Sequence, residues 1–134
     1  MDEKLLPSHI IKKAHITSNE YSWKKDDFEE VIEAARFVGL ASIGGSPQFI
    51  FPDGISELYW INYDSQDRKQ GETWASYVHR SAEEVIANFR QVCASREFQA
   101  EVWDRTSIQP DNLDHLWFVI YFMREASTPK YEEW

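Results

Sequence analysis

The chain has 134 residues, of which 43% are hydrophobic and 15% aromatic, and this much apolar material excludes a disordered chain. Its 23 acidic and 14 basic residues give a formal net charge of −9, which excludes nucleic acid and anionic membrane surfaces as favoured partners because their phosphates repel it. The same charge suits a strongly basic protein partner, or serves only to keep a small protein in solution. One domain over residues 1–134 is expected.

The cysteine count and the hydropathy pattern indicate a cytoplasmic protein. Cys93 is the single cysteine, so an intramolecular disulfide and a four-cysteine zinc site are both excluded. The first residues are charged and lack the long apolar core of a signal peptide. The longest apolar run, residues 116–123, is far shorter than the roughly 20 residues that a membrane-spanning helix needs.

The first clear element in chain order is a helix over residues 24–38. Residues 1–20 are weakly patterned, with one or two helical turns that begin at Pro7. Asp26 is the expected N-cap of the helix, and Gly39 lies where a glycine would end it. Its apolar positions follow the i, i+3, i+4, i+7 spacing of an amphipathic helix. They are Phe28, Val31, Ile32, Ala35 and Val38.

A β-hairpin is predicted next. Residues 40–43 form a short strand or an extended exit from the helix, "GGSP" is a turn, and "QFIF" at residues 48–51 is a strand. "PDG" is a tight turn, and the alternation of residues 55–63 predicts the returning strand. The glycines at 44 and 45 do not suit a phosphate cradle, because they follow a helix and lead into a strand instead of the reverse.

The second half of the chain predicts a long helix and two further strands. A polar loop at residues 64–72 precedes a helix over residues 73–94, which breaks in two if Ser81 and Glu84 form a capping box. Residues 98–104 alternate like a strand, and residues 115–124 are apolar on both faces, as in a central strand. We therefore expect an α+β fold of two layers, an antiparallel sheet of about four strands with two main helices.

No residue pattern predicts a catalytic centre, a cofactor or a metal site. The four histidines do not share a helical face with other metal ligands. His79 and Glu83 are an ordinary i, i+4 pair on a solvated face, and His115 precedes the apolar strand, where it would have to act as an acid or base at a sheet edge. Cys93 is expected to pack as a small apolar side chain.

Two segments carry a family resemblance, "SWKKDDFEEVIEAARFVGLASIGG" and the following "FIFPDGISELYW". With the helix that comes next, they span about residues 22–92. They resemble small immunity proteins encoded beside bacterial polymorphic toxins, including those of contact-dependent growth inhibition. The resemblance transfers no catalytic residue. It implies selective binding of one cognate toxin domain, expected to be a basic nuclease, so that the producing cell is protected.

Two other functions remain open at this point. One is a small enzyme of an unrecognised class that uses His115 or His79 as its base. The other is a homo-oligomeric interaction module with no toxin partner. The oligomeric state does not follow from the sequence.

The expected partner surface is the polar face of the first helix. At about 100° per residue, Asp26, Glu30, Glu33 and Phe37 fall within one stripe opposite the apolar positions. Phe37 is either an aromatic anchor for a basic partner or a core residue covered by the hairpin or the C-terminal tail. The loop acids Asp64 and Asp67 are expected to extend the same surface.

Overall fold

The computed structural model describes residues 1–106, 108 and 110–125. In this part of the chain no helix has the length and apolar character needed to cross a membrane. The elements in chain order are η1 (Glu3–Leu5), α1 (Ser8–Ile11), β1 (His15–Thr17), β2 (Glu20–Trp23), α2 (Lys25–Phe37), β3 (Ala41–Gly44), β4 (Pro47–Phe51), β5 (Gly54–Glu57), α3 (Trp74–Ser95), α4 (Phe98–Thr106), β6 (Leu116–Val119) and β7 (Tyr121–Met123).

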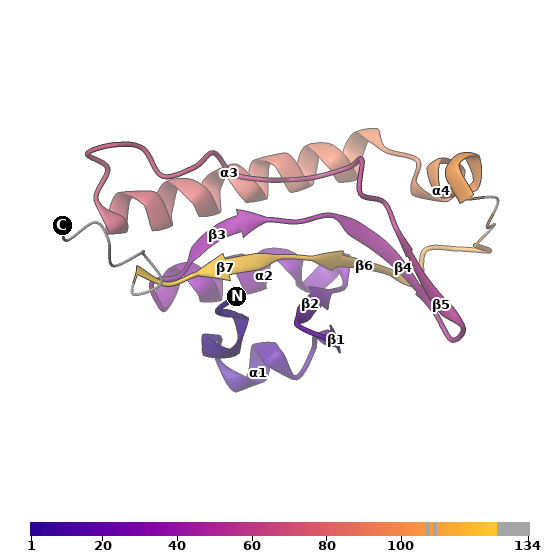
Figure 1. Ribbon diagram of the computed structural model, residues 1–134, viewed down its shortest axis with the longest axis horizontal. Coiled ribbons are helices and arrows are strands. Elements are labelled where there is room, and N and C mark those ends of the chain that lie inside the picture. The colour runs from indigo at the N-terminus through magenta and orange to yellow at the C-terminus, as the bar shows by residue number, and fades with distance from the viewer. Residues whose placement is uncertain (107, 109, 126–134) are drawn as a thin grey trace.

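The strands form an antiparallel sheet of order β1-β2-β6-β4-β5 and a smaller pair, β3-β7. Since β3 leads directly into β4 and β6 into β7, the two sheets are continuous along one long ribbon, which Figure 1 shows running beside α3. The α+β class and the antiparallel pairing are confirmed, but the main sheet has five strands instead of about four. The strands β1 and β2 come from a segment in which the sequence pattern showed no strand.

The core lies between the ribbon and the two long helices. Phe28 of α2 stacks on Phe89 of α3 with ring centroids 4.0 Å apart, and both meet Phe118 of β6, at 6.0 and 5.0 Å. All three rings are buried. Offset and edge-on aromatic pairs add about 0.5–1.5 kcal/mol each beyond the burial of apolar area. The helices α2 and α3 therefore cover the same face of the sheet.

The apolar run at residues 115–124 is central in the sheet, as its composition predicted. The strand β6 pairs with β2 on one side and with β4 on the other. Ile120, which is fully buried, separates β6 from β7. The single expected strand is therefore two, because the residues before Ile120 pair with β2 and β4 and those after it pair with β3.

The two long helices lie where the periodicity placed them, but their ends and continuity differ in detail. Lys24 is the N-cap of α2 and provides no side-chain cap, so Asp26 is not the N-cap. Gly39 has φ +82° just beyond the helix, a conformation that glycine adopts at little cost. The helix α3 is continuous through Ser81, so the single long helix is confirmed and the alternative of a break at Ser81 is wrong. The buried Ser81 hydroxyl accepts a hydrogen bond from the Ser42 amide at 3.0 Å instead of capping a new helix.

Residues 98–104 are helical in α4, so the strand expected there is wrong. Phe98 and Val102 are four residues apart and both are buried, which is the spacing of one helical face. The intervening Ala100 made the same residues look alternating. Trp103, 47% exposed, lies away from that buried face.

The strand that returns from the hairpin is shorter than expected. It ends at Glu57, and the chain then turns, with the Leu58 amide bonded to the Pro47 carbonyl at 3.0 Å and the Ile61 amide to the Leu58 carbonyl at 3.0 Å. This turn buries Leu58, Ile61 and Tyr63. A continued strand would have placed Leu58 and Ile61 on opposite faces, so burial of both decides against it.

The pair Gly44 and Gly45 is neither a turn nor a phosphate cradle. The chain does not reverse there, because β3 and β4 pair in sequence with β7 and β6. Gly44 has φ +133°, and a Cβ on it would overlap Asp64. A Cβ on Gly45 would overlap the Val119 carbonyl. The glycines therefore allow two other segments of the chain to approach the backbone at the bend of the ribbon.

Candidate functional site

The predicted stripe of α2 lies on the outer face of the molecule. Asp26, Glu30 and Glu33 are exposed, and Phe37 at the end of the stripe is 92% exposed. The hairpin therefore does not cover Phe37. The other cover considered, the C-terminal tail, lies largely in residues 126–134, outside the described residues.

Two acids of this stripe are already partnered within the chain. Lys13 Nζ lies 2.9 Å from Glu30 Oε1, and this hydrogen bond holds the pKa of Glu30 below its ordinary value. Arg36 lies 2.5 Å from Glu33 and 2.6 Å from Glu83 of α3. Asp26 has no ion-pair partner in the part of the chain that the structure describes. Its charge is therefore the least compensated of the stripe.

The loop acids do not join the α2 stripe. Asn88 Nδ2 donates to the Asp64 carbonyl at 2.9 Å, and Arg80 Nη2 donates to the Asp67 carbonyl at 3.1 Å. These two side chains leave α3 on the flank opposite to Glu83 and Arg90, which pair with α2. The helix α3 therefore lies between the stripe and the loop, and the six residues form two separate surfaces.

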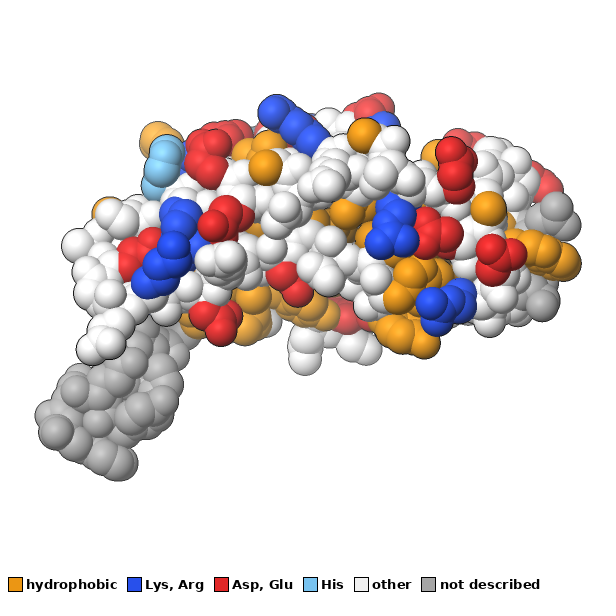
Figure 2. Space-filling view, turned by 90° about the horizontal axis from the view of Figure 1, so that it is seen from above, with side chains coloured by type: hydrophobic (Ala, Val, Ile, Leu, Met, Phe, Trp, Pro, Cys, Tyr) orange, Lys and Arg blue, Asp and Glu red, His pale blue; other side chains and the backbone are white. Residues whose placement is uncertain are grey.

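The outward face of α3, between those surfaces, is electrically mixed. Figure 2 shows acidic and basic side chains interspersed over the side of the molecule that includes α3. They include the ion pairs of Arg90 with Glu29 at 2.6 Å and of Arg80 with Glu84 at 2.8 Å. Exposed pairs of this kind contribute little free energy. These ion pairs do cancel charge locally, so the unpaired carboxylates of the chain lie on other parts of its surface.

Unpaired carboxylates line a pocket of about 340 Å³ beside Gly44 and Gly45. Gly44 and Gly45 form part of its wall, and its charged lining residues are Glu57, Asp64 and Asp67. None of these three carboxylates makes an ion pair with another described residue. Burial raises the pKa of Asp64, and a hydrogen bond from the Gly45 backbone opposes the shift.

Glu57 and Tyr121 in the same pocket were not singled out from the sequence. Tyr121 donates its hydroxyl proton to Glu20 Oε2 at 2.5 Å, and burial together with this bond raises its pKa. Glu57 was recognised only as one member of an alternating strand. Its proximity to Asp64 depends on the bend at the glycines, which local patterning does not reveal.

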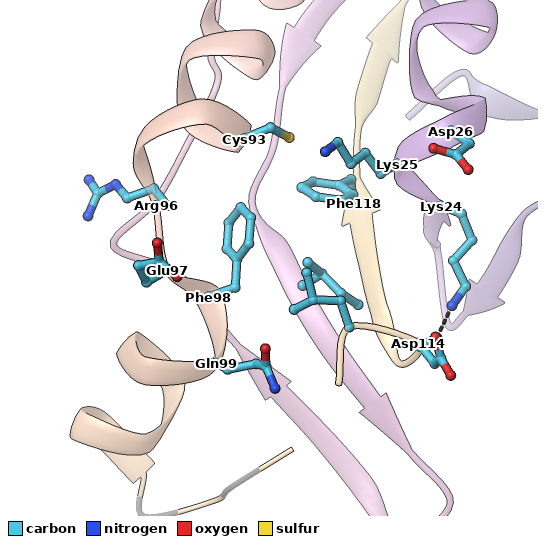
Figure 3. Close-up of a pocket in the computed structure, with 12 residues that line it drawn as sticks. Lys24, Lys25, Asp26, Cys93, Arg96, Glu97, Phe98, Gln99, Asp114 and Phe118 are labelled. Atoms are coloured by element: carbon cyan, nitrogen blue, oxygen red, sulfur yellow. Dashed lines mark hydrogen bonds between the residues drawn. The ribbon is translucent and has the colours of Figure 1, made fainter. Parts of the chain in front are cut away.

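A second pocket, of about 270 Å³, lies where the N-terminus of α2 meets the C-terminus of α3 and the start of α4. In Figure 3 the Cys93 thiol and the Lys25 ammonium point toward each other above the rings of Phe98 and Phe118, and Lys24 turns away to donate to the Asp114 carbonyl. Its cations are Lys24, Lys25 and Arg96, and its carboxylates are Asp26, Glu97 and Asp114. These charges balance, so the pocket has no preference for an anion or a cation.

Cys93 in that pocket is half-buried and packs against the hydrophobic core, as a small apolar side chain would. Burial raises the pKa of its thiol, and the nearby Lys25 only partly opposes this. A nucleophilic cysteine needs the opposite shift, toward the thiolate.

The histidines proposed as possible bases lie outside both pockets. His79 Nδ1 is 3.0 Å from Arg36 Nη1, and His115 tilts against the Phe51 ring with centroids 5.3 Å apart. Neither lines the pocket at the glycines or the pocket of Figure 3. Within the described residues no group of three or more acidic, histidine or cysteine side chains is arranged to hold a metal ion.

Comparison of the chain with protein-family models, with curated proteins and with solved structures found no match.

Proposed function

We propose that this chain is an immunity protein that binds a cognate bacterial toxin domain in the cytoplasm and neutralises it. The toxin domain is expected to be basic, and a nuclease. The observation that carries the proposal is Phe37, a ring 92% exposed at the end of an acidic stripe on the outer face of α2. A large apolar side chain left in water is unfavourable, and aromatic side chains of this kind are enriched at the centre of protein interfaces.

The charge of the chain supports the same function. A net charge of −9 favours encounter with a basic partner and disfavours encounter with the nucleic acid that such a partner would bind. In this scheme the net negative charge of the whole chain, with Asp26 as the uncompensated acid of the α2 stripe, raises the rate of association. The Phe37 ring, buried on binding, lowers the rate of dissociation.

Neutralisation would follow from binding alone. The chain covers the toxin's active site or an adjacent surface, and no group of the chain takes part in a reaction. Neutralisation by coverage needs a stable, folded surface and no reactive pocket. The outer face of α2, a helix that is fixed to the core by Phe28 and Ile32, provides such a surface.

The function is tested with the product of the neighbouring gene. If that gene encodes a toxin, producing it together with this chain should restore growth, and the two proteins should copurify from the cells. Growth arrest despite a folded chain, together with no copurification, would overturn the proposal. Capture from the native cells of further copies of the chain alone would favour the homo-oligomeric module instead.

A further inference from the structure

The strand β5 ends the five-stranded sheet and pairs only with β4, so its outer edge is open. The strands of the smaller sheet are treated differently. The Phe122 amide of β7 donates to the buried Glu3 carboxylate at 3.1 Å, and the Ser42 amide of β3 donates to the Ser81 hydroxyl at 3.0 Å. Unpaired backbone groups at a sheet edge form a template for a further strand. The edge of β5 is therefore a place where an extended segment can be added.

The hydrogen-bond pattern identifies the backbone groups that point outward from β5. The Leu58 amide donates to the Pro47 carbonyl at 3.0 Å, so the even-numbered residues of β5 direct their backbone groups at β4. The backbone groups of Ile55 and Glu57 therefore point away from β4. Among the described residues they have no hydrogen-bond partner outside the sheet. They offer two donors and two acceptors to a neighbouring strand.

Exposed apolar side chains accompany this edge. Ile55 is 44% exposed, and Tyr59, just beyond the strand, is 70% exposed. Figure 1 shows the β4–β5 hairpin at the end of the sheet, with its tip clear of α2 and α3. An added strand would therefore find apolar contact as well as backbone partners, and no helix obstructs the tip.

The two ends of the edge carry opposite charges. Asp53 lies exposed at the hairpin tip, at the start of β5. At the other end the guanidinium of Arg105 lies 4.7 Å from the centre of the Trp60 ring, which comes directly after Tyr59. Neither Asp53 nor Arg105 has an ion-pair partner in the described part of the chain. If this edge pairs antiparallel with a second copy of itself, each acid approaches the other copy's cation.

We propose that two copies of the chain pair antiparallel through β5, around a two-fold axis at Ser56, so that their sheets join into one. Ile55 of each copy then lies opposite Glu57 of the other, and each such pair exchanges both backbone hydrogen bonds. The neighbouring symmetric registers place Glu57 opposite either Glu57 or Asp53 of the second copy. Like charges directly opposite are destabilising, so charge selects the register centred on Ser56.

This dimer goes beyond the proposed function and leaves the α2 stripe free. Arg36, beside Phe37, pairs with Glu83 in the first half of α3, whereas Trp60 bonds to Glu101 of α4, which follows the end of α3. The two surfaces therefore lie toward opposite ends of α3. Toxin binding neither requires nor prevents the dimer, so the failure of one proposal leaves the other standing.

The dimer is tested by sedimentation of the chain at up to about 1 mM, where a contact as short as this edge is measurable. At about 0.15 M ionic strength, charges more than about 8 Å apart are largely screened, so the net charge of each copy opposes association only weakly. We expect a monomer–dimer equilibrium with a dissociation constant below about 1 mM. A chain that stays monomeric at this concentration would overturn the proposal.

Proline variants locate the contact. Ile55→Pro removes an outward amide without removing a bond to β4, and should weaken the dimer at least about tenfold, because each copy loses one donor. Ile16→Pro is the matched control at the opposite edge of the sheet. Its partner Tyr21 bonds to β6 through the Ile120 amide, so the Ile16 amide also points outward. Both variants are checked by thermal melting. An equal loss of association in the two variants would contradict a contact through β5.

Charge reversal tests the register. Asp53→Arg and Arg105→Asp should each weaken the dimer at least about fivefold, since like charges then meet at both ends of the edge. The variant with both changes re-forms the pairs with their charges exchanged, and should dimerise within about twofold of the parent. A double variant as weak as the single variants would overturn the proposed register.

Hydrogen exchange followed by NMR gives an independent measurement. The amides of Ile55 and Glu57 should exchange freely in dilute solution and at least about tenfold more slowly in the dimer. The Ser56 amide, which faces β4, should be protected in both. A dimer that forms without protection of Ile55 and Glu57 would use another surface, and this proposal would fail.

Discussion

Two phenylalanines of α2, nine residues apart, show how position on a helix sets the role of a side chain. Phe28 is fully buried and stacks on Phe89, whereas Phe37 is 92% exposed. The spacing assigns them to opposite faces of the helix. It does not say whether another segment covers the outer one. The structure therefore adds that the Phe37 side chain is exposed. The role of the exposed ring can be tested by truncating it to alanine.

Phe37→Ala should leave the melting temperature unchanged, because the ring has almost no packing to lose. If α2 is the docking surface, the same variant should bind the proposed toxin partner at least about tenfold more weakly, as a truncated aromatic anchor does. Thermal melting and a binding titration measure the two effects. Tyr59→Ala, which removes a ring 70% exposed outside α2, is the control and should keep full affinity. A Phe37→Ala chain of parental stability and affinity would rule out the anchor.

The glycines at the bend of the ribbon give a second prediction at the residue scale. Gly45→Ala should lower the free energy of unfolding by about 2 kcal/mol or more, because the new methyl group would overlap the Val119 carbonyl, and backbone yields less readily than a side chain. Gly54→Ala in the hairpin is the control, since nothing lies within 4 Å of the added Cβ. Urea unfolding compares the two. Equal losses would mean that close approach at the bend is not what position 45 requires.

At the scale of elements, periodicity found the long helices and missed the short pieces. The helices α2 and α3 each repeat their apolar face over several turns, so the pattern predicts them almost to the residue. The helix α4 has only nine residues, and its Phe98, Ala100 and Val102 satisfy a strand pattern equally well. The strands β1 and β2 have no apolar alternation of their own, because Trp23 is the only fully buried large side chain in them and pairing with β6 holds them in place.

The loop between β5 and α3 is held to the helix by charge, which gives a pH prediction. Arg80 Nε lies 2.7 Å from Glu72 Oε2, and this bond lowers the pKa of Glu72 to about 2 from an ordinary 4.5. A carboxyl group with a depressed pKa stabilises the folded state above its unfolded pKa, and the contribution is lost as the pH falls through the folded value. The loop should therefore stay attached at pH 4 and be released only as the pH approaches 2.

NMR titration of the Glu72 carboxyl, read together with the amides of residues 66–69, measures this release. Glu72→Gln should release the loop at neutral pH, while Glu97→Gln, which removes an exposed acid with no ion-pair partner among the described residues, should not. A Glu72 midpoint near 4.5 would contradict the proposed ion pair.

At the scale of the whole molecule, the fold and the charge were more predictable than the sites. Composition and element order indicate an antiparallel α+β domain, because apolar area must be buried and short connections favour antiparallel neighbours. The α2 stripe could be read from helical geometry alone. The pocket at the glycines could not, because Glu57 of β5 and Asp64 of the following loop line it together only through the tertiary fold. Local sequence contains no sign of such a crossing.

The net charge of −9 predicts how binding to the proposed basic toxin domain should depend on salt. Charges on the two proteins steer encounter from a distance, and dissolved ions screen them over about 10 Å at 0.1 M ionic strength. Raising the ionic strength from about 0.05 to about 0.5 M should therefore lower the association rate constant at least about tenfold. In the proposed complex, the dissociation rate should depend mainly on close packing around Phe37 and should change much less with salt. Stopped-flow association and chase-dissociation measurements separate the two rates. An association rate that does not respond to salt would show that the acidic surface does not steer the partner, even if the complex is tight.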